Sequence, residues 1–212
     1  MNGTPLIGTT LVERLCALDT ATLYESGARG TMTSEIKMLS GHRRLAGPAL
    51  TVMCPPGDNL MIHVAVARAQ TGMVMVVQSH DPTYGVWGEV LTVAAIARGI
   101  AGLVVDGSVR DLGAIRRLGF PVFARGTALR GTTKIAPGII DAVITCGGVP
   151  VSSADLIVGD ESGIVVIRPR DAEDVLAKAQ ERCEKEASLM KELRAGRTTM
   201  ELLDLDKNLA GG

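Results

Sequence analysis

The sequence predicts an α/β fold in which helices cover a mainly parallel sheet. In the middle of the chain, short runs of apolar residues alternate with segments of helical pattern, which is typical of strand-helix-strand units. Hydrophobic residues make up 46% of the 212 residues and aromatic residues only 2%, so the core must be aliphatic. A chain of this length can bury roughly 70% of its unfolded surface.

The predicted elements follow from apolar runs, helix caps and glycine stops. Pro55 to Gly57 closes the first strand, Asp58 can cap the helix that follows, and Gly99 and Gly119 end two later helices. The predicted order is a helix at 9–16, a strand at 49–54, a helix from 58 to about 70, a strand at 73–77, a loop at 78–88, a helix at 89–98, a strand at 102–106, a helix at 112–118 and a strand at 121–124.

After Gly131 the pattern changes to short strands separated by Gly, Pro and Asp. The segments 141–145, 156–159 and 164–167 suggest a β-rich section that returns against the central sheet. A long helix then runs from Asp171 to about Ala195 with one apolar stripe, which fits packing on its own domain or on another subunit. Thr198 and Glu201 have the spacing of a capping box for a last short helix.

Charge and composition exclude several classes of function. The net charge of −1 and the few aromatic residues argue against nucleic-acid binding, and no apolar run is long enough for a membrane span. The four cysteines are widely spaced, without a C-x-x-C pair, and no basic start precedes an apolar run at the N-terminus. We therefore expect a reduced, cytoplasmic compartment.

The sharpest candidate site is Gly88-Glu89 followed, after 20 residues, by Arg110-Asp111. Both pairs open predicted helices, and ligands of open α/β sheets bind where strands end. The free backbone amides of Gly88, Glu89, Val90 and Leu91 could bind a carboxylate. Arg110 could bind a carboxylate and an oxo group together. Asp111 could offer one hard oxygen to Mg²⁺, and Glu89 could steer a proton.

Each of these residues also has a purely structural interpretation. Glu89 suits the dipole at a helix start, Asp111 is a good N-cap, and Arg110 fits a surface ion pair. Lys134, after a Gly-Thr loop, could contact an anion or be solvated. The three histidines, His42, His63 and His80, lack metal-ligand spacing, so we expect each to be structural.

Several motifs follow one another in order: Gly88-Glu-Val-Leu91, Val104-Val-Asp-Gly-Ser-Val-Arg-Asp111, Pro121-Val-Phe-Ala124, Gly148-Val-Pro-Val151, Asp155-Leu-Ile-Val-Gly-Asp160 and Gly163-Ile-Val-Val-Ile167. Together they resemble the RraA-like family. The resemblance covers about residues 10–195 of a single domain at 1–212 and leaves 196–212 as a C-terminal tail. The family includes class II 4-hydroxy-4-methyl-2-oxoglutarate / 4-carboxy-4-hydroxy-2-oxoadipate aldolases and the regulator of ribonuclease activity A.

The resemblance implies a swivelling α-β-β-α sandwich with a long C-terminal helix, assembled as a homotrimer or homohexamer with sites at subunit interfaces. It implies that the amides of 88–91 and Arg110 bind pyruvate, that Asp111 binds Mg²⁺ or Mn²⁺, and that Lys134 lies near the substrate. A glutamate of the last long helix is expected to reach the neighbouring site; Glu186 is the best match and Glu184 its rival.

The implied function is that of a metal-dependent lyase. It cleaves a 4-hydroxy-2-oxo acid to pyruvate and a second oxo acid, with oxaloacetate decarboxylation as a side activity. The alternative is a non-catalytic regulator that binds an RNA-degrading enzyme. One position departs from the aldolase pattern: the acid 21 residues before Arg110 is Glu89 where the aldolases have Asp. The extra methylene moves the carboxylate by about 1 Å, a shift to which catalysis is sensitive.

Overall fold

The structure is a computed structural model that describes residues 9–28, 30–41, 44–79 and 81–209. Within these ranges the helices are α1 (Thr9–Cys16), α2 (Thr20–Glu25), α3 (Leu60–Arg68), α4 (Glu89–Ala97), α5 (Leu112–Leu118), the 3-10 turn η1 (Pro169–Asp171), α6 (Ala172–Arg194), α7 (Thr199–Leu202) and α8 (Asp206–Leu209). None of these helices is long and apolar enough to cross a bilayer. His42 and His80 lie outside the described residues.

The described strands form one ten-stranded sheet and a separate hairpin. The parallel centre is β3 (Leu45–Met53), β4 (Val74–Gln78), β6 (Gly102–Val109) and β7 (Val122–Thr127). The antiparallel strands are β1 (Gly30–Thr31), β2 (Lys37–Met38), β8 (Ile139–Ile140), β11 (Leu156–Asp160) and β12 (Gly163–Ile167). Strand β5 (Gly85–Trp87) pairs with β6, and the hairpin is β9 (Ile144–Cys146) with β10 (Val149–Val151).

Period-two alternation along buried strands assigns each side chain to one of two apolar layers. On β4, Met75 and Val77 pack under α3, α4 and α5, whereas Val74 and Val76 face the opposite way. All four are buried, as expected for parallel strands that are covered on both faces. The predicted strand at 73–77 is therefore confirmed.

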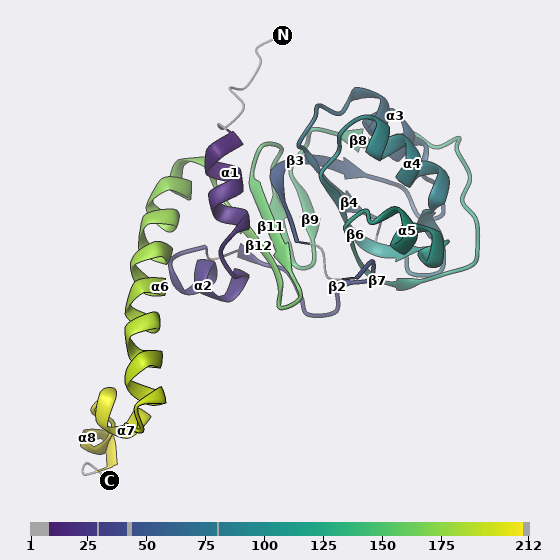
Figure 1. Ribbon diagram of the computed structural model, residues 1–212. Coiled ribbons are helices and arrows are strands. Elements are labelled where there is room, and N and C mark those ends of the chain that lie inside the picture. The colour runs from purple at the N-terminus through teal and green to yellow at the C-terminus, as the bar shows by residue number, and fades with distance from the viewer. Residues whose placement is uncertain (1–8, 29, 42–43, 80, 210–212) are drawn as a thin grey trace.

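The antiparallel strands fold over the inner face of the parallel centre. Ile157 of β11 and Val166 of β12 point into the same apolar layer as Val76, and Val158 and Val165 point outward under α1, α2 and α6. The layers run helices, parallel strands, antiparallel strands, helices (Figure 1). This order confirms the predicted α-β-β-α sandwich.

Helix α6 divides into a packed half and a projecting half. Its buried residues, Ala172, Val175, Leu176 and Ala179, all lie in the first eight positions, on the outer antiparallel layer. Beyond them the helix extends away from the sandwich and carries α7 and α8 at its end (Figure 1). The predicted capping box at α7 is confirmed, since Glu201 N and Thr198 Oγ1 are bonded at 3.2 Å and Thr198 N donates to the Glu201 carboxylate.

The short strand β5 lies in the segment predicted as a loop. Three residues give too short a pattern to indicate a strand, and β5 exists because it can pair with the end of β6. Its first residue needs to be glycine, since a Cβ at Gly85 would lie 2.6 Å from Ala128 O. Through β5 the chain enters α4 beside the carboxyl end of β6, where the candidate site is built.

Candidate functional site

Two strand-to-helix turns meet at one edge of the parallel strands, the β5-α4 turn at Gly88 and the β6-α5 turn at Arg110-Asp111. Arg110 N donates to Trp87 O at 2.8 Å, and Glu89 N donates to Asp111 Oδ2 at 3.2 Å. The two motif halves that lie 20 residues apart in the sequence are thus hydrogen-bonded to each other.

Gly88 allows the close approach of the two turns. A Cβ at this position would lie 2.5 Å from Asp111 Oδ2 and 3.2 Å from Arg110 Cγ. Any side chain larger than hydrogen would therefore displace the Asp111 carboxylate. The first turn of α4 then presents the Val90 and Leu91 amides, which have no partner within the helix because of their position.

Asp111 has a left-handed backbone, with φ of 54° and ψ of 33°, at the position just before α5. Asp tolerates this conformation better than most residues, and a non-glycine residue held there is often functional. Its side chain makes no cap hydrogen bond to α5 and turns to the start of α4 instead. The carboxylate is 44% exposed, so it can accept a further ligand from the open side.

The positive charge of Arg110 lies beside this carboxylate, with Nε 3.7 Å from Asp111 Oδ2. The guanidinium is 47% exposed, so this ion pair contributes little to stability. Among the described residues its other N–H groups have no partner, so they can bind an anion in the adjoining cavity.

The cavity has a volume of about 210 Å³. That is below the roughly 300–1,000 Å³ of pockets for drug-sized ligands and suits a small metabolite. Its lining residues are Asn59, His63, Gly85, Val86, Trp87, Gly88, Val90, Leu91, Arg110, Asp111, Gly131, Thr132 and Lys134.

Asp58 fixes the wall of the cavity formed by residues 131–136. Its Oδ2 accepts hydrogen bonds from Thr133 Oγ1 at 2.7 Å, Ile135 N at 2.8 Å and Ala136 N at 3.2 Å, while Oδ1 accepts from Leu60 N at 2.8 Å. Burial alone would raise the pKa of this carboxyl, but these donors together hold the pKa far below its usual range. The N-cap of α3 is Asn59 and not Asp58 as predicted; Asp58, one residue earlier, instead anchors the segment that carries Lys134.

The structure brings most of the predicted site residues to this cavity. Gly88, Val90, Leu91, Arg110, Asp111 and Lys134 all line it. The exposed side chain of Glu89 does not line the cavity, although its amide binds Asp111.

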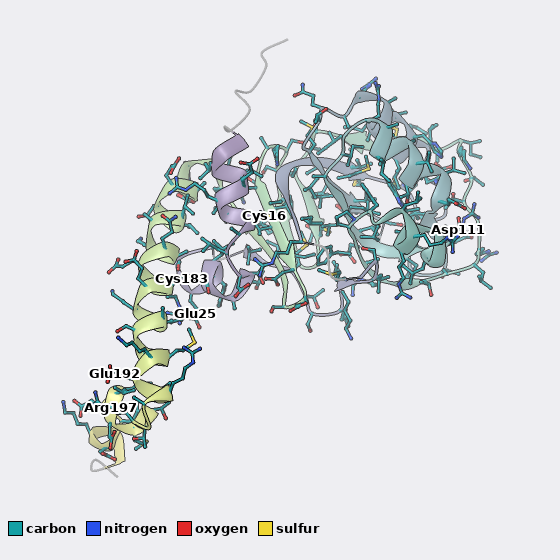
Figure 2. All side chains as sticks on the ribbon, in the orientation of Figure 1. Cys16, Glu25, Asp111, Cys183, Glu192 and Arg197 are labelled. Carbon is teal, nitrogen blue, oxygen red and sulfur yellow. The ribbon has the colours of Figure 1, made fainter. Side chains whose placement is uncertain are left out.

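Glu186 lies elsewhere in the same chain, on α6. Its carboxylate is 2.8 Å from Arg182 Nε, and Arg182 also pairs with Glu25. Figure 2 shows Asp111 on the side of the sandwich away from α6, which carries the labelled Cys183 and Glu192. Glu184 is on the same helix and is exposed.

Asn59 and His63 are among the lining residues that sequence reasoning did not predict, and both are polar. Asn59 is 5% exposed and His63 is one turn further along α3. The pKa of His63 is lowered by burial and, secondarily, by the charge of Lys134, so its imidazole is neutral near pH 7. The only signal in the sequence was that these two polar residues lie four positions apart at the start of a helix. Residue pairs of this kind are also common in purely structural roles.

The donor set fits a cation that keeps most of its ligands as water or substrate oxygens. Among the described residues, no three His, Cys, Asp or Glu side chains gather as a metal cluster. A half-exposed carboxylate such as Asp111 suits Mg²⁺ or Mn²⁺, which favour hard oxygen ligands, and does not suit a closed zinc site.

Comparisons with known proteins agree with the geometry. Residues 15–166 match the family model described as "RraA-like: Aldolase/RraA". A Halalkalibacterium halodurans protein named "Putative 4-hydroxy-4-methyl-2-oxoglutarate aldolase" is 42% identical over 152 residues, which cover 71% of this chain and 72% of the relative.

Two solved structures have the same fold over most of the chain. An uncharacterized protein from Pseudomonas syringae pv. tomato has a TM-score of 0.83 and 25% identity, covering 93% of this chain and 94% of its own. Streptomyces coelicolor RraAS2, titled as an unusual member of the RNase ES inhibitor RraA protein family, has a TM-score of 0.79 and 27% identity, covering 89% and 99%. The fold, the matched segment and the joined motif together place this chain in the RraA-like family.

Proposed function

We propose that the protein is a divalent-metal-dependent carbon-carbon lyase that cleaves a 4-hydroxy-2-oxo acid to pyruvate and a second oxo acid. The observation that carries this proposal is the hydrogen-bonded junction of the two turns, which sets helix amides, a guanidinium and a carboxylate around one small cavity. The name of the 42%-identical relative supports the aldolase chemistry.

The proposed binding mode follows from the charges that line the cavity. The substrate's 1-carboxylate would accept from the Val90 and Leu91 amides at the start of α4 and from Arg110. Lys134, on the wall anchored by Asp58, would attract the second carboxylate. Asp111 is the residue that would hold Mg²⁺ or Mn²⁺, which would supply Lewis-acid stabilisation of negative charge on the 2-oxo oxygen.

The proposed cleavage breaks the bond between carbons 3 and 4 of the substrate. Its electron pair stays on carbon 3 as the pyruvate enolate, which Arg110 stabilises, and the 4-hydroxyl group gives its proton to a water molecule and becomes the new carbonyl. A proton then adds to carbon 3 and gives pyruvate. We assign Glu89 as the acid that steers this proton. Decarboxylation of oxaloacetate passes through the same enolate without loss of a hydroxyl proton.

We further propose that the site is completed by a second copy of the chain in a trimer or hexamer. Val90, in the first turn of α4, is 78% exposed. Leu129 is 97% exposed and lines a shallow depression together with Asp111. A neighbouring α6 could bring Glu186, or its rival Glu184, to this open side. Sedimentation velocity of the purified chain would test the assembly.

The alternative candidate is a regulator that binds an RNA-degrading enzyme. The observation that favours it is the structural likeness to RraAS2, whose title places it in a family of RNase ES inhibitors. It predicts binding to such an enzyme that Asp111→Asn leaves intact, because no metal chemistry is involved.

The deciding experiment measures pyruvate release from 4-hydroxy-4-methyl-2-oxoglutarate and from oxaloacetate, with Mg²⁺, with Mn²⁺ and with EDTA. We expect release from both substrates that depends on the metal. Absence of metal-dependent release from both would refute the proposed lyase.

A further inference from the structure

The wall of the cavity at the start of α3 carries two buried polar atoms without a protein partner. They are Asn59 Oδ1 and His63 Nε2, and neither has a hydrogen-bond partner among the described residues. A buried polar atom left unsatisfied costs about 1–3 kcal/mol, so a pair of them in one cavity wall points to a ligand.

The orientation of the Asn59 amide is fixed by its other end. Its Nδ2 donates to Val86 O at 2.9 Å, and a flipped amide would place two carbonyl oxygens against each other. Asn59 lines the cavity, and its atom without a partner is therefore Oδ1, which can only accept a hydrogen bond. The backbone N of Asn59 also donates to Thr133 O at 3.1 Å, which ties the residue to the wall formed by residues 131–136 and holds it in place.

His63 presents the complementary partner. Burial and the nearby Lys134 lower the pKa of its imidazole, so at neutral pH Nε2 either donates or accepts a single hydrogen bond. The side chain is one helical turn from Asn59, on the face of α3 that lines the same cavity.

Together these two atoms select the chemistry of the occupant. A carboxylate oxygen cannot donate to Asn59 Oδ1, and an ammonium group is disfavoured by Arg110 and Lys134 in the same cavity. A hydroxyl group can donate to Oδ1 and accept from Nε2–H of neutral His63, which satisfies both atoms at once.

We propose that Asn59 and His63 form a hydroxyl-binding subsite that recognises the 4-hydroxyl group of the substrate. This inference rests on the proposed function for the identity of the ligand. The subsite fixes the hydroxyl group before cleavage and so sets the orientation of the bond between carbons 3 and 4. It distinguishes 4-hydroxy-2-oxo acids from oxo acids of the same length that lack the hydroxyl group.

Binding selectivity tests the subsite without reliance on turnover. Calorimetric titration with one enantiomer of 4-hydroxy-2-oxoglutarate at a time and with 2-oxoglutarate, in EDTA so that no hydroxy acid is cleaved, gives a ratio of dissociation constants for each variant. We expect the wild-type chain to bind the better hydroxylated enantiomer about 10-fold or more tightly than 2-oxoglutarate, the effect of one well-made buried hydrogen bond.

His63→Leu and Asn59→Ala should bring this ratio to near one, whereas His63→Gln, whose amide can still donate, should keep most of it. Arg68→Leu, on the exposed last turn of α3, is the matched control and should leave the ratio unchanged. Because the ratio is internal to each variant, a loss of stability does not imitate the result, and His63→Gln remains informative if Asn59→Ala fails to fold.

Pyruvate release from the same hydroxy acid and from oxaloacetate distinguishes failure of the hydroxyl-binding subsite from failure of the proposed lyase activity. With the subsite, His63→Leu lowers kcat/KM for the hydroxy acid by about 10-fold and leaves oxaloacetate within about threefold. Equal binding of the two oxoglutarates by the wild-type chain, or a ratio that His63→Leu does not alter, overturns the subsite even where pyruvate release succeeds. Selective binding without any pyruvate release would overturn the lyase and keep the subsite.

Discussion

The amide of Glu89 and the carboxylate of Asp111 are hydrogen-bonded at 3.2 Å, so two strand-to-helix turns are joined into one site. Glu89 opens α4 and Asp111 precedes α5, and both helices cover the same face of the parallel strands. This hydrogen bond also orients the Asp111 carboxylate, because Oδ2 accepts from Glu89 N and Oδ1 is left to bind a ligand.

Replacement of Gly88 by alanine should disable the site without unfolding the protein. The added Cβ would lie 2.5 Å from Asp111 Oδ2 and would push the carboxylate from its place. A misplacement near 1 Å costs about 100-fold in rate, which a pyruvate-release assay would detect. Gly126→Ala is the control, since a Cβ there meets nothing within 4 Å. Full activity of Gly88→Ala would contradict the assigned geometry.

Asp111→Asn should abolish metal-dependent turnover while the backbone stays as it is. Asn tolerates the left-handed conformation with φ of 54° as well as Asp does, so the variant removes the charge without new strain. We expect a loss of at least about 100-fold in kcat/KM and weaker Mn²⁺ binding, measured by electron paramagnetic resonance. The control is Asp141→Asn, which has φ of 61° and does not line the cavity. Equal Mn²⁺ affinity in both variants would exclude Asp111 as the ligand.

Asp58→Asn should destabilise the protein and loosen the wall that carries Lys134. Whichever way the new amide turns, its NH₂ group faces donors that Asp58 now accepts from, Leu60 N on one side or Thr133, Ile135 and Ala136 on the other. We expect a loss of about 1–3 kcal/mol in urea denaturation. Asp174→Asn, on the exposed face of α6, should change stability by no more than about 0.5 kcal/mol.

The same carboxylate predicts how stability depends on pH. The pKa of Asp58 is lower in the folded than in the unfolded chain, so its contribution is complete above the unfolded value of about 3.9 and is lost as pH falls below it. Unfolding free energies measured from pH 6 to pH 2.5 should therefore fall less steeply in Asp58→Asn than in the wild-type chain. Parallel curves would show that the carboxylate does not have a lowered pKa.

The imidazole of His63 should titrate below its ordinary range, and Lys134 should account for part of the shift. Burial is the larger cause, so Lys134→Met should raise the pKa of His63 without restoring it fully. Histidine NMR titration gives both values directly, and Lys191→Met, on exposed α6, serves as the control. A pKa of His63 that is the same in Lys134→Met and the wild-type chain would mean that the two side chains do not face each other.

The sequence predicted the parts of the fold that depend on local pattern. The strand at 73–77 and the helix at 112–118 are confirmed because apolar periodicity, caps and glycine stops all act within a few residues. It did not predict β5, which exists only through pairing with β6.

The same limit applies to the site. Gly88 and Arg110-Asp111 were found because they form a spaced motif at helix starts. Asn59 and His63 were not predicted to line the cavity, because which wall α3 supplies depends on tertiary packing. Asp58 was assigned as a helix cap, but its bonds to residues 133–136 are contacts across more than 70 positions of chain.

Trp87 gives the site its own optical reporter. It is the single tryptophan of the chain, lines the cavity directly before Gly88, and is buried with its ring stacked 6.0 Å from Phe120. Its Nε1 donates to Thr92 Oγ1 at 2.8 Å, so the indole is held against the first turns of α4. Tryptophan fluorescence of the unlabelled protein, excited where tyrosine does not absorb, therefore comes from a single position in the cavity wall, where the arrival of a ligand can be followed in real time.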